Sequence, residues 1–298
     1  MNKLVSVIIP TYSRPKNLKR AINSVLNQTY KNIEIIVVDD NGIDTQEQKE
    51  TENVIKEYLL LSNFFYLKHE RNMNGSAARN TGIRYSHGEY IAFLDDDDEF
   101  LDQKIEIQVN ALERLDKSWG GCYCNIDIVG REIKTICNSK SGNLVEDLLL
   151  GSVRFNSSTL LLRKDVCQEL NGFDESFVRH QDWEFMIRFF RDYKIYLPSK
   201  EILINKYSSS EHLNISKSKS FIEIKNKFLN TFKDDIDKCP SKNAIYHKHW
   251  MEIANSLLRD HEYNLSIFYL NRAISYQKCS YYDVKQMAKT FLASLFKW

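Results

Sequence analysis

The chain has 298 residues, of which 43% are hydrophobic and 27% charged, so it can bury a substantial core and is not expected to be disordered. Its formal net charge of +1 gives no overall bias toward nucleic acid, and we expect none as a partner. None of the six cysteines forms a Cys-x-x-Cys pair, which argues against zinc ribbons and redox motifs and favours a reducing, cytoplasmic compartment. Every apolar run is shorter than the ~18 residues of a membrane span, so we expect neither a span nor a signal peptide.

The first third of the chain alternates buried strands with helices. Residues 4–9 and 33–38 are continuous β-branched runs, typical of strands that are buried on both faces. Further strands are expected at 64–68 and 90–94. Helices are expected between these strands, one with Pro15 in its first turn, one over 46–61 and one from a cap at Ser76 to Ser86. This order predicts an α/β fold, a Rossmann-like α/β/α sandwich with a mostly parallel sheet.

The pattern changes after about residue 121. Short strands are expected near 121–129, 158–162 and 202–207, with a helix near 182–192. Everything after about 216 reads as helical, and residues 254–273 resemble a single tetratricopeptide-type helix pair. We therefore expect two domains. The first covers residues 1–215, with a nucleotide half at about 1–98 and an acceptor half at about 99–215. The second is an α-helical extension at 216–298.

Charge is divided unevenly between these regions. Residues 206–298 carry 15 Lys and Arg against 9 Asp and Glu, a net charge of +6, which leaves −5 for the rest of the chain. The basic region could face an anionic partner, such as a membrane surface. The apolar residues near the C-terminus, from Phe291 to Trp298, could enter a membrane interface or pack in a helical core.

Acidic residues follow two of the expected strands. Asp95–Asp98 come directly after the strand at 90–94, and Asp39 and Asp40 follow the strand at 33–38. Ligands bind at the carboxyl ends of strands in such sheets, so both turns are expected to open onto one cleft. Four adjacent carboxylates repel one another and favour a divalent cation such as Mg²⁺ or Mn²⁺, although a solvated loop or a helix N-terminus is the alternative.

Five segments together resemble the successive motifs of the family-two inverting glycosyltransferases. The spacing and order of the segments match, and the resemblance extends from residue 4 to about 215. The segments are 5–12 (VSVIIPTY), 37–42 (VVDDNG), 78–82 (ARNTG), 88–98 (GEYIAFLDDDD) and 181–183 (QDW).

The resemblance implies a GT-A fold and transfer of a sugar from a nucleotide diphosphate donor, most simply a UDP-sugar, to an acceptor hydroxyl with inversion. Bacterial members often build surface polysaccharides on lipid carriers, so the implied acceptor is a saccharide or a lipid-linked saccharide. An enzyme of this kind would lie in the cytoplasm or peripherally at the inner face of the membrane. The resemblance is also compatible with an oligomeric enzyme. The implied nucleotide-binding residues are Pro10, Thr11, Tyr12, Arg14, Asp40, Arg79, Asp95 and Asp96; the implied ligands of Mn²⁺ or Mg²⁺ are Asp97 and His212.

Asp182 is the implied catalytic base. Gln181 stands where the family usually has Glu, so a second acid is missing there. From the sequence alone, Asp182 could instead cap the helix near 182–192, since Asp is a common helix cap.

Three other functions fit the pattern less well. A sugar-nucleotide nucleotidyltransferase or a dinucleotide dehydrogenase would have a Gly-rich loop after the first strand, where this chain has PTYSR at 10–14. An inactive, transferase-like binding module remains an alternative. The intact Asp40, Asp97 and Asp182 argue against it.

Two pairs of residues of metal-binding types are interpreted as structural. His247 and His249 should face different sides of a helix, and Cys122 and Cys124 should pack in the core.

Overall fold

The computed structural model describes residues 2–207 and 218–295, apart from the side chains of 218, 219 and 295. Its contacts divide the chain into two compact units. The first consists of Met1–Val145 and Val153–Ser210, and the second of Glu146–Ser152 and Glu211–Trp298. The segment Glu146–Ser152 therefore belongs with the C-terminal helices, although it lies in the middle of the sequence.

The first unit is built on a seven-stranded sheet with the order β10-β6-β9-β4-β1-β2-β3. The strands β1 to β4 are parallel to one another, whereas β9 runs antiparallel to both of its neighbours, β4 and β6. A mostly parallel sheet is therefore confirmed. The strands are β1 (Val5–Thr11), β2 (Ile33–Asp39), β3 (Phe64–Lys68), β4 (Tyr90–Phe93), β6 (Trp119–Cys122), β9 (Leu161–Arg163) and β10 (Lys194–Tyr196).

A second, four-stranded sheet has the order β5-β11-β7-β8. Its strand β5 begins inside the acidic run and pairs antiparallel with β11, where Lys206 lies opposite Asp98. The second sheet thereby brings a lysine to the acidic turn. The strands are β5 (Asp98–Phe100), β7 (Asn125–Val129), β8 (Ile133–Ile136) and β11 (Ile202–Tyr207).

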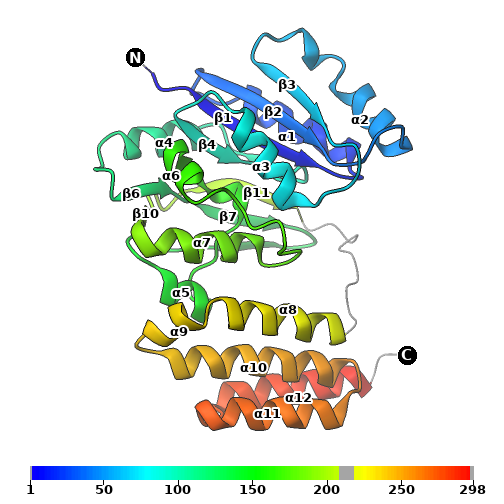
Figure 1. The fold of residues 1–298 in the computed structure, drawn as a ribbon, viewed down its shortest axis with the longest axis vertical. Helices are drawn as coiled ribbons and strands as arrows, with labels where there is room; N and C mark the ends of the chain where they lie inside the picture. The colour runs from blue at the N-terminus through cyan, green and yellow to red at the C-terminus, as the bar shows by residue number, and fades with distance from the viewer. Residues whose placement is uncertain (1, 208–217, 296–298) are drawn as a thin grey trace. The chain divides into compact units, whose positions relative to one another are not determined.

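Helices cover both faces of the large sheet, and Figure 1 shows α3 and α6 over the nearer face. Alternate residues of β1 face opposite sides: Val5, Val7 and Ile9 join a core with residues of α1 and α4, while Ile8 faces α3. Helix α3 approaches so closely that a Cβ on Gly82 would lie 2.4 Å from Cγ2 of Ile8. The helices of this unit are α1 (Pro15–Leu26), α2 (Gln46–Ile55), α3 (Gly75–Tyr85), α4 (Lys104–Leu112), α6 (Lys164–Glu169) and α7 (Gln181–Asp192).

Three sequence predictions need correction. Helix α3 is capped by Asn74, whose side chain accepts hydrogen bonds from the N–H groups of Ser76 and Ala77, rather than by Ser76. The helix predicted over 46–61 ends at Ile55, and a short 3₁₀ turn, η1 (Tyr58–Leu60), follows it. The strand predicted near 158–162 is divided into a 3₁₀ turn, η2 (Ser157–Thr159), and β9.

The described residues of the second unit form helices joined by short turns. Helix α10 is central and contacts α8, α9, α11 and α12. His247 and His249 are both buried on α10, where His247 meets the carbonyl of Ala273 and His249 meets Lys225. The helices are α5 (Val145–Leu150), which straddles the two units, α8 (Ser218–Thr231), α9 (Lys233–Lys238), α10 (Lys242–Arg259), α11 (Tyr263–Tyr276) and α12 (Tyr281–Leu295). Within residues 2–207 and 218–295, none of the helices combines the length and apolar character that a bilayer span requires.

Candidate active site

The candidate site lies where β4, β1 and β2 end. These three strands are parallel neighbours, so their carboxyl ends meet at one edge of the sheet. Thr11 ends β1, Asp39 ends β2, and Asp95 follows β4 after one residue. The two acidic turns therefore open at the same edge, as the order of strands and helices predicted.

Asp96 and Asp97 are held by the last residue of β1 and by the segment that follows it. Oδ2 of Asp96 accepts hydrogen bonds from Oγ1 of Thr11 (2.8 Å) and from the N–H of Tyr12 (3.3 Å). Arg14 Nη1 lies 3.2 Å from Oδ1 of Asp96 and 2.7 Å from Oδ2 of Asp97. Burial raises the pKa of Asp96 to about 6 despite these partners. The segment after β1 thus compensates two carboxylates that would otherwise repel each other.

Asp95 pairs with Arg79 of α3. Nη2 of Arg79 lies 2.6 Å from Oδ1 of Asp95, and Nη1 donates a 3.0 Å hydrogen bond to Oε1 of Gln181. Burial alone would raise the pKa of Asp95, but the charges of Arg79 and Lys206 outweigh it and lower that pKa. Asp95 is therefore ionised at neutral pH and has a fixed orientation.

Asp98 is the first residue of β5, and its carboxylate contacts Ser158 and Lys206. Its Oδ2 accepts a 2.6 Å hydrogen bond from Oγ of Ser158 and lies 3.4 Å from Nζ of Lys206. Burial raises the pKa of Asp98 to about 7. Oγ of Ser158 also accepts from the N–H of Asp95 (3.0 Å), so this serine connects the two ends of the acidic run.

Carboxylate oxygens of Asp95, Asp97 and Asp98 lie within 4.8 Å of one another. This is the one group of such residues, among those that the structure describes, with the spacing to hold a metal ion. Hard oxygen donors suit Mg²⁺ or Mn²⁺, so this donor set fits the predicted cation. Asp96 is not in the group because it points toward Thr11 and Arg14. His212, the other predicted ligand, lies outside the described residues.

Asp40 lies 3% exposed at the end of β2. Its two oxygens accept hydrogen bonds from Nδ1 of His69 (2.7 Å), the N–H of Met73 (2.8 Å) and the N–H of Asn74 (2.9 Å). An ionised carboxylate offers about four acceptor positions, so three internal partners leave one for a ligand. Asp40 therefore also positions the loop that leads into α3.

Asp182 lies in the first turn of α7, but it is not the cap of that helix. The cap position is occupied by His180, whose backbone has a left-handed conformation with φ of 58°. Oδ1 of Asp182 accepts a 2.7 Å hydrogen bond from Oγ of Ser157 in η2. Burial raises the pKa of Asp182, although Arg79 and Ser157 act in the opposite direction. A raised pKa moves a carboxyl group toward the range that a general base needs.

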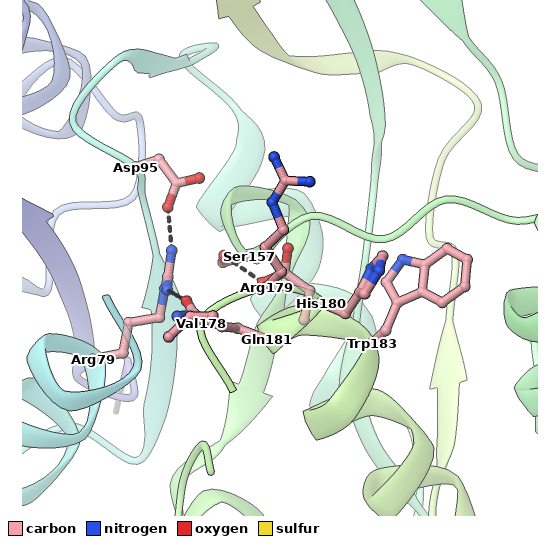
Figure 2. Close-up of a pocket in the computed structure, with 9 residues that line it drawn as sticks. Arg79, Asp95, Ser157, Val178, Arg179, His180, Gln181 and Trp183 are labelled. Carbon is pink, nitrogen blue, oxygen red and sulfur yellow. Dashed lines mark hydrogen bonds and ion pairs between the residues drawn. The ribbon is translucent and has the colours of Figure 1, made fainter. Parts of the chain in front are cut away.

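An open pocket of about 270 Å³ joins these groups. It is lined by Arg79, Asp95, Ser157, Gln181 and Asp182, together with residues 178–180 and Trp183. Figure 2 shows Arg79 extending between Asp95 and Gln181 at one wall, with Trp183 at the opposite side. The predicted base and the first residue of the acidic run therefore line the same pocket.

The structure thus gathers most of the predicted site residues at one sheet edge. Tyr12 is 49% exposed there, so its ring is available for stacking. Pro10 pairs in register with Val38 on β2 and lies next to Thr11. The sequence prediction missed Ser157, Ser158 and Lys206, which hold Asp182 and Asp98. Nothing in the local sequence pattern distinguishes these three residues.

The family model and the relatives that match this chain all describe glycosyltransferases. The family model described as Glycosyl transferase family 2 matches residues 6–170. The amylovoran biosynthesis glycosyltransferase AmsB of Erwinia amylovora is 31% identical over 196 residues, which cover 61% of this chain and 62% of that protein. The poly(ribitol-phosphate) beta-N-acetylglucosaminyltransferase TarP of Staphylococcus aureus is 33% identical over 253 residues, covering 82% of this chain and 74% of TarP.

Solved structures show the same fold at low sequence identity. TarS 1–349 of Staphylococcus aureus in complex with UDP-GlcNAc has a TM-score of 0.61 at 16% identity, and the match covers 97% of this chain and 91% of TarS 1–349. The mannosyltransferase PcManGT of Pyrobaculum calidifontis, in complex with GDP-Man and Mn²⁺, has a TM-score of 0.59 at 15% identity. The match covers 100% of this chain and 82% of PcManGT. These likenesses confirm the predicted GT-A fold. The matched part of the chain spans 66% of glycosyltransferase RP339 of Rickettsia prowazekii and 62% of AmsB.

Proposed function

The chain belongs to glycosyl transferase family 2, and we propose that it transfers a sugar from a nucleotide diphosphate donor to an acceptor hydroxyl with inversion. The observation that carries this proposal is the pocket lined by both Asp95 and Asp182. Asp95 begins the acidic run, and Asp182, whose pKa is raised by burial, lies at the same pocket.

The donor's nucleotide is proposed to lie along the ends of β1 and β2. Tyr12 would stack on the base, and the remaining acceptor position of Asp40 would receive the base N3–H. Uracil carries such an N–H, so the preferred donor is a UDP-sugar. TarS binds UDP-GlcNAc whereas PcManGT binds GDP-Man, so the shared fold alone does not choose between the two bases.

The carboxylates of Asp95, Asp97 and Asp98 are proposed to hold Mn²⁺ or Mg²⁺. Such an ion, when bound, neutralises the negative charge that develops on the departing nucleoside diphosphate. Arg14 supplies positive charge at Asp97, and Arg79 supplies it at Asp95. These two side chains would orient the carboxylates and remain near the diphosphate.

Asp182 is proposed as the general base. An acceptor hydroxyl is weakly nucleophilic, so a carboxylate that takes its proton during attack contributes ~10²- to 10⁴-fold in rate. Ser157 keeps the carboxylate oriented toward the pocket. With the base on one side of the sugar and the leaving group on the other, a single displacement inverts the anomeric centre.

The acceptor is proposed to be a saccharide or lipid-linked saccharide of a bacterial surface polysaccharide. AmsB and TarP, both of which act in glycan synthesis by name, support this assignment. Residues 216–298 are proposed to serve the acceptor or an anionic membrane surface rather than donor chemistry, because of their excess of basic residues. A cytoplasmic location, peripheral at the membrane, follows from the same proposal.

A donor screen tests the proposal directly. The full chain is incubated with UDP-, GDP- and TDP-sugars, with Mn²⁺ or with EDTA, and release of the nucleoside diphosphate is measured. We expect release from a UDP-sugar that requires the metal. A clear preference for GDP-sugars would contradict the uracil assignment, and absence of release or transfer from every donor, with saccharide acceptors present, would contradict the enzyme assignment.

A further inference from the structure

A second pocket lies within the helical unit, where α8, α9, α10 and α11 meet. It has a volume of about 330 Å³, in the range of small-ligand sites. All of its lining residues belong to the second unit, so it is separate from the donor chemistry of the first.

Aromatic rings form one side of this helical-unit pocket. The rings of Tyr246 and Tyr276 stack with centroids 4.8 Å apart, and Trp250 stacks on Tyr269 at 5.8 Å. Tyr246, Tyr276 and Trp250 all line the pocket. Aromatic walls with a few polar groups are typical of sites that bind ring-shaped organic ligands.

Basic side chains outnumber acidic ones among the described residues that line the same pocket. Its only carboxylate among the described lining residues, Asp237, is paired with Lys233 and accepts a hydrogen bond from Tyr246. Lys242 and Arg272 have no carboxylate within ion-pair distance in the described part of the chain. Cζ of Arg272 lies 3.8 Å from the centroid of the Trp250 ring, and this contact limits the freedom that the side chain would lose on binding an anion.

Unused hydrogen-bonding groups complete the pocket. The indole N–H of Trp250, a residue only 3% exposed, has no partner among the residues that the structure describes. The exposed amides of Asn230 and Asn243 lie at the same pocket and suit a ligand rich in hydroxyl groups.

We propose that this pocket binds a phosphate-bearing sugar unit and thereby holds an anionic acceptor chain. Arg272 and Lys242 receive the phosphate, while Tyr246 and Tyr276 contact the sugar. The part of the proposal that concerns the acceptor rests on the proposed glycosyltransferase function; the binding itself does not. A simple anion site would need no aromatic wall, and a neutral saccharide would need no unpaired cations.

Titrations followed by ³¹P NMR test the binding on the full chain. Glucose 6-phosphate is compared with inorganic phosphate and, in competition, with glucose. We expect saturable binding of glucose 6-phosphate, weaker binding of phosphate, and a loss of roughly 10-fold or more in affinity for Arg272→Gln or Lys242→Gln. Lys285→Gln, an exposed lysine of α12 outside the pocket, is the matched control and should bind like the parent chain.

Release of nucleoside diphosphate into water, measured on the same variants, separates the two proposals. Each variant should keep this release and its melting temperature, while its KM for a phosphate-bearing acceptor rises and that for a neutral acceptor does not. No saturable binding, equal affinity for inorganic phosphate, or equal loss in Lys285→Gln would overturn the pocket proposal. A chain that binds glucose 6-phosphate through Arg272 but releases no nucleoside diphosphate would contradict only the proposed function.

Discussion

Oγ of Ser157 donates a 2.7 Å hydrogen bond to Oδ1 of Asp182. Ser157 is 1% exposed and belongs to the 3₁₀ turn η2, which lies 25 residues before Asp182 in the chain. The bond favours the ionised carboxylate, whereas burial favours the protonated one. Burial, the charges of Arg79 and Asp95, and this hydrogen bond together decide at which pH Asp182 can accept a proton.

Ser157→Ala should shift the pH profile of transfer. Without the hydroxyl, the pKa of Asp182 rises further above its ordinary value, and a general base loses activity as pH falls through its pKa. The acidic limb of kcat should therefore move to higher pH, with a loss of transfer that grows as the pH falls. Ser157→Thr, which keeps the hydroxyl, should restore the profile. An unchanged acidic limb in Ser157→Ala would show that this bond does not tune the base.

Gln181→Glu should also raise the pH at which the enzyme becomes active. The amide of Gln181 makes two hydrogen bonds: its oxygen accepts one from Arg79, and its NH₂ group donates one of 3.0 Å to the carbonyl of Phe177. Glu would lose the second bond and add a negative charge beside Asp182, which raises the pKa of that carboxyl. We expect reduced transfer at neutral pH that recovers at alkaline pH. Higher transfer at acidic pH would contradict this role of Gln181.

Asp97→Ala should abolish metal-dependent donor binding. A site with three carboxylates loses a large part of its affinity for Mn²⁺ when one is removed. Calorimetry with the donor in the presence and absence of Mn²⁺ measures this loss. Asp102→Ala, which removes an exposed carboxylate that is outside the group, is the control. If Asp97→Ala keeps its full manganese dependence, the ion is held by other residues of the acidic run.

Gly82→Ala should destabilise the first unit. Replacing Gly by Ala inside a helix normally stabilises it by about 0.5–1 kcal/mol. Here the new Cβ would lie 2.4 Å from Cγ2 of Ile8, and relief of such overpacking costs about 1–3 kcal/mol. The clash should outweigh the helix gain, which urea unfolding can measure. An increase in the free energy of unfolding would mean that α3 and β1 can move apart without cost.

The sequence predicted the part of the fold that repeats regularly. Continuous β-branched runs located β1 and β2, and the parallel order then placed Asp40 and Asp95 at one edge. The antiparallel direction of β9 was not predicted, because a three-residue strand carries no periodic signal for its direction. The cap of α3 was misplaced because Asn74 and Ser76 are both good cap residues, and only the backbone decides between them.

Within the site, the sequence could not predict where each carboxylate points. A run of four Asp looks uniform, yet the turn directs Asp96 toward Thr11 and Asp98 toward Ser158. Lys206 reaches Asp98 only because β11 pairs with β5 across 108 residues of chain. Such partners are brought together by the tertiary structure. A sequence motif therefore locates the carboxylates but does not reveal the groups that orient them.

Asp182→Asn tests the central claim most directly. Asn keeps the size of the side chain and can still bond to Ser157, but it cannot accept the acceptor's proton. Transfer should fall by at least ~10²-fold, while the melting temperature and donor affinity stay close to those of the parent chain. Asp192→Asn, at the exposed end of the same helix, is the matched control and should transfer normally. Near-normal transfer by Asp182→Asn on a true acceptor would contradict the proposed mechanism.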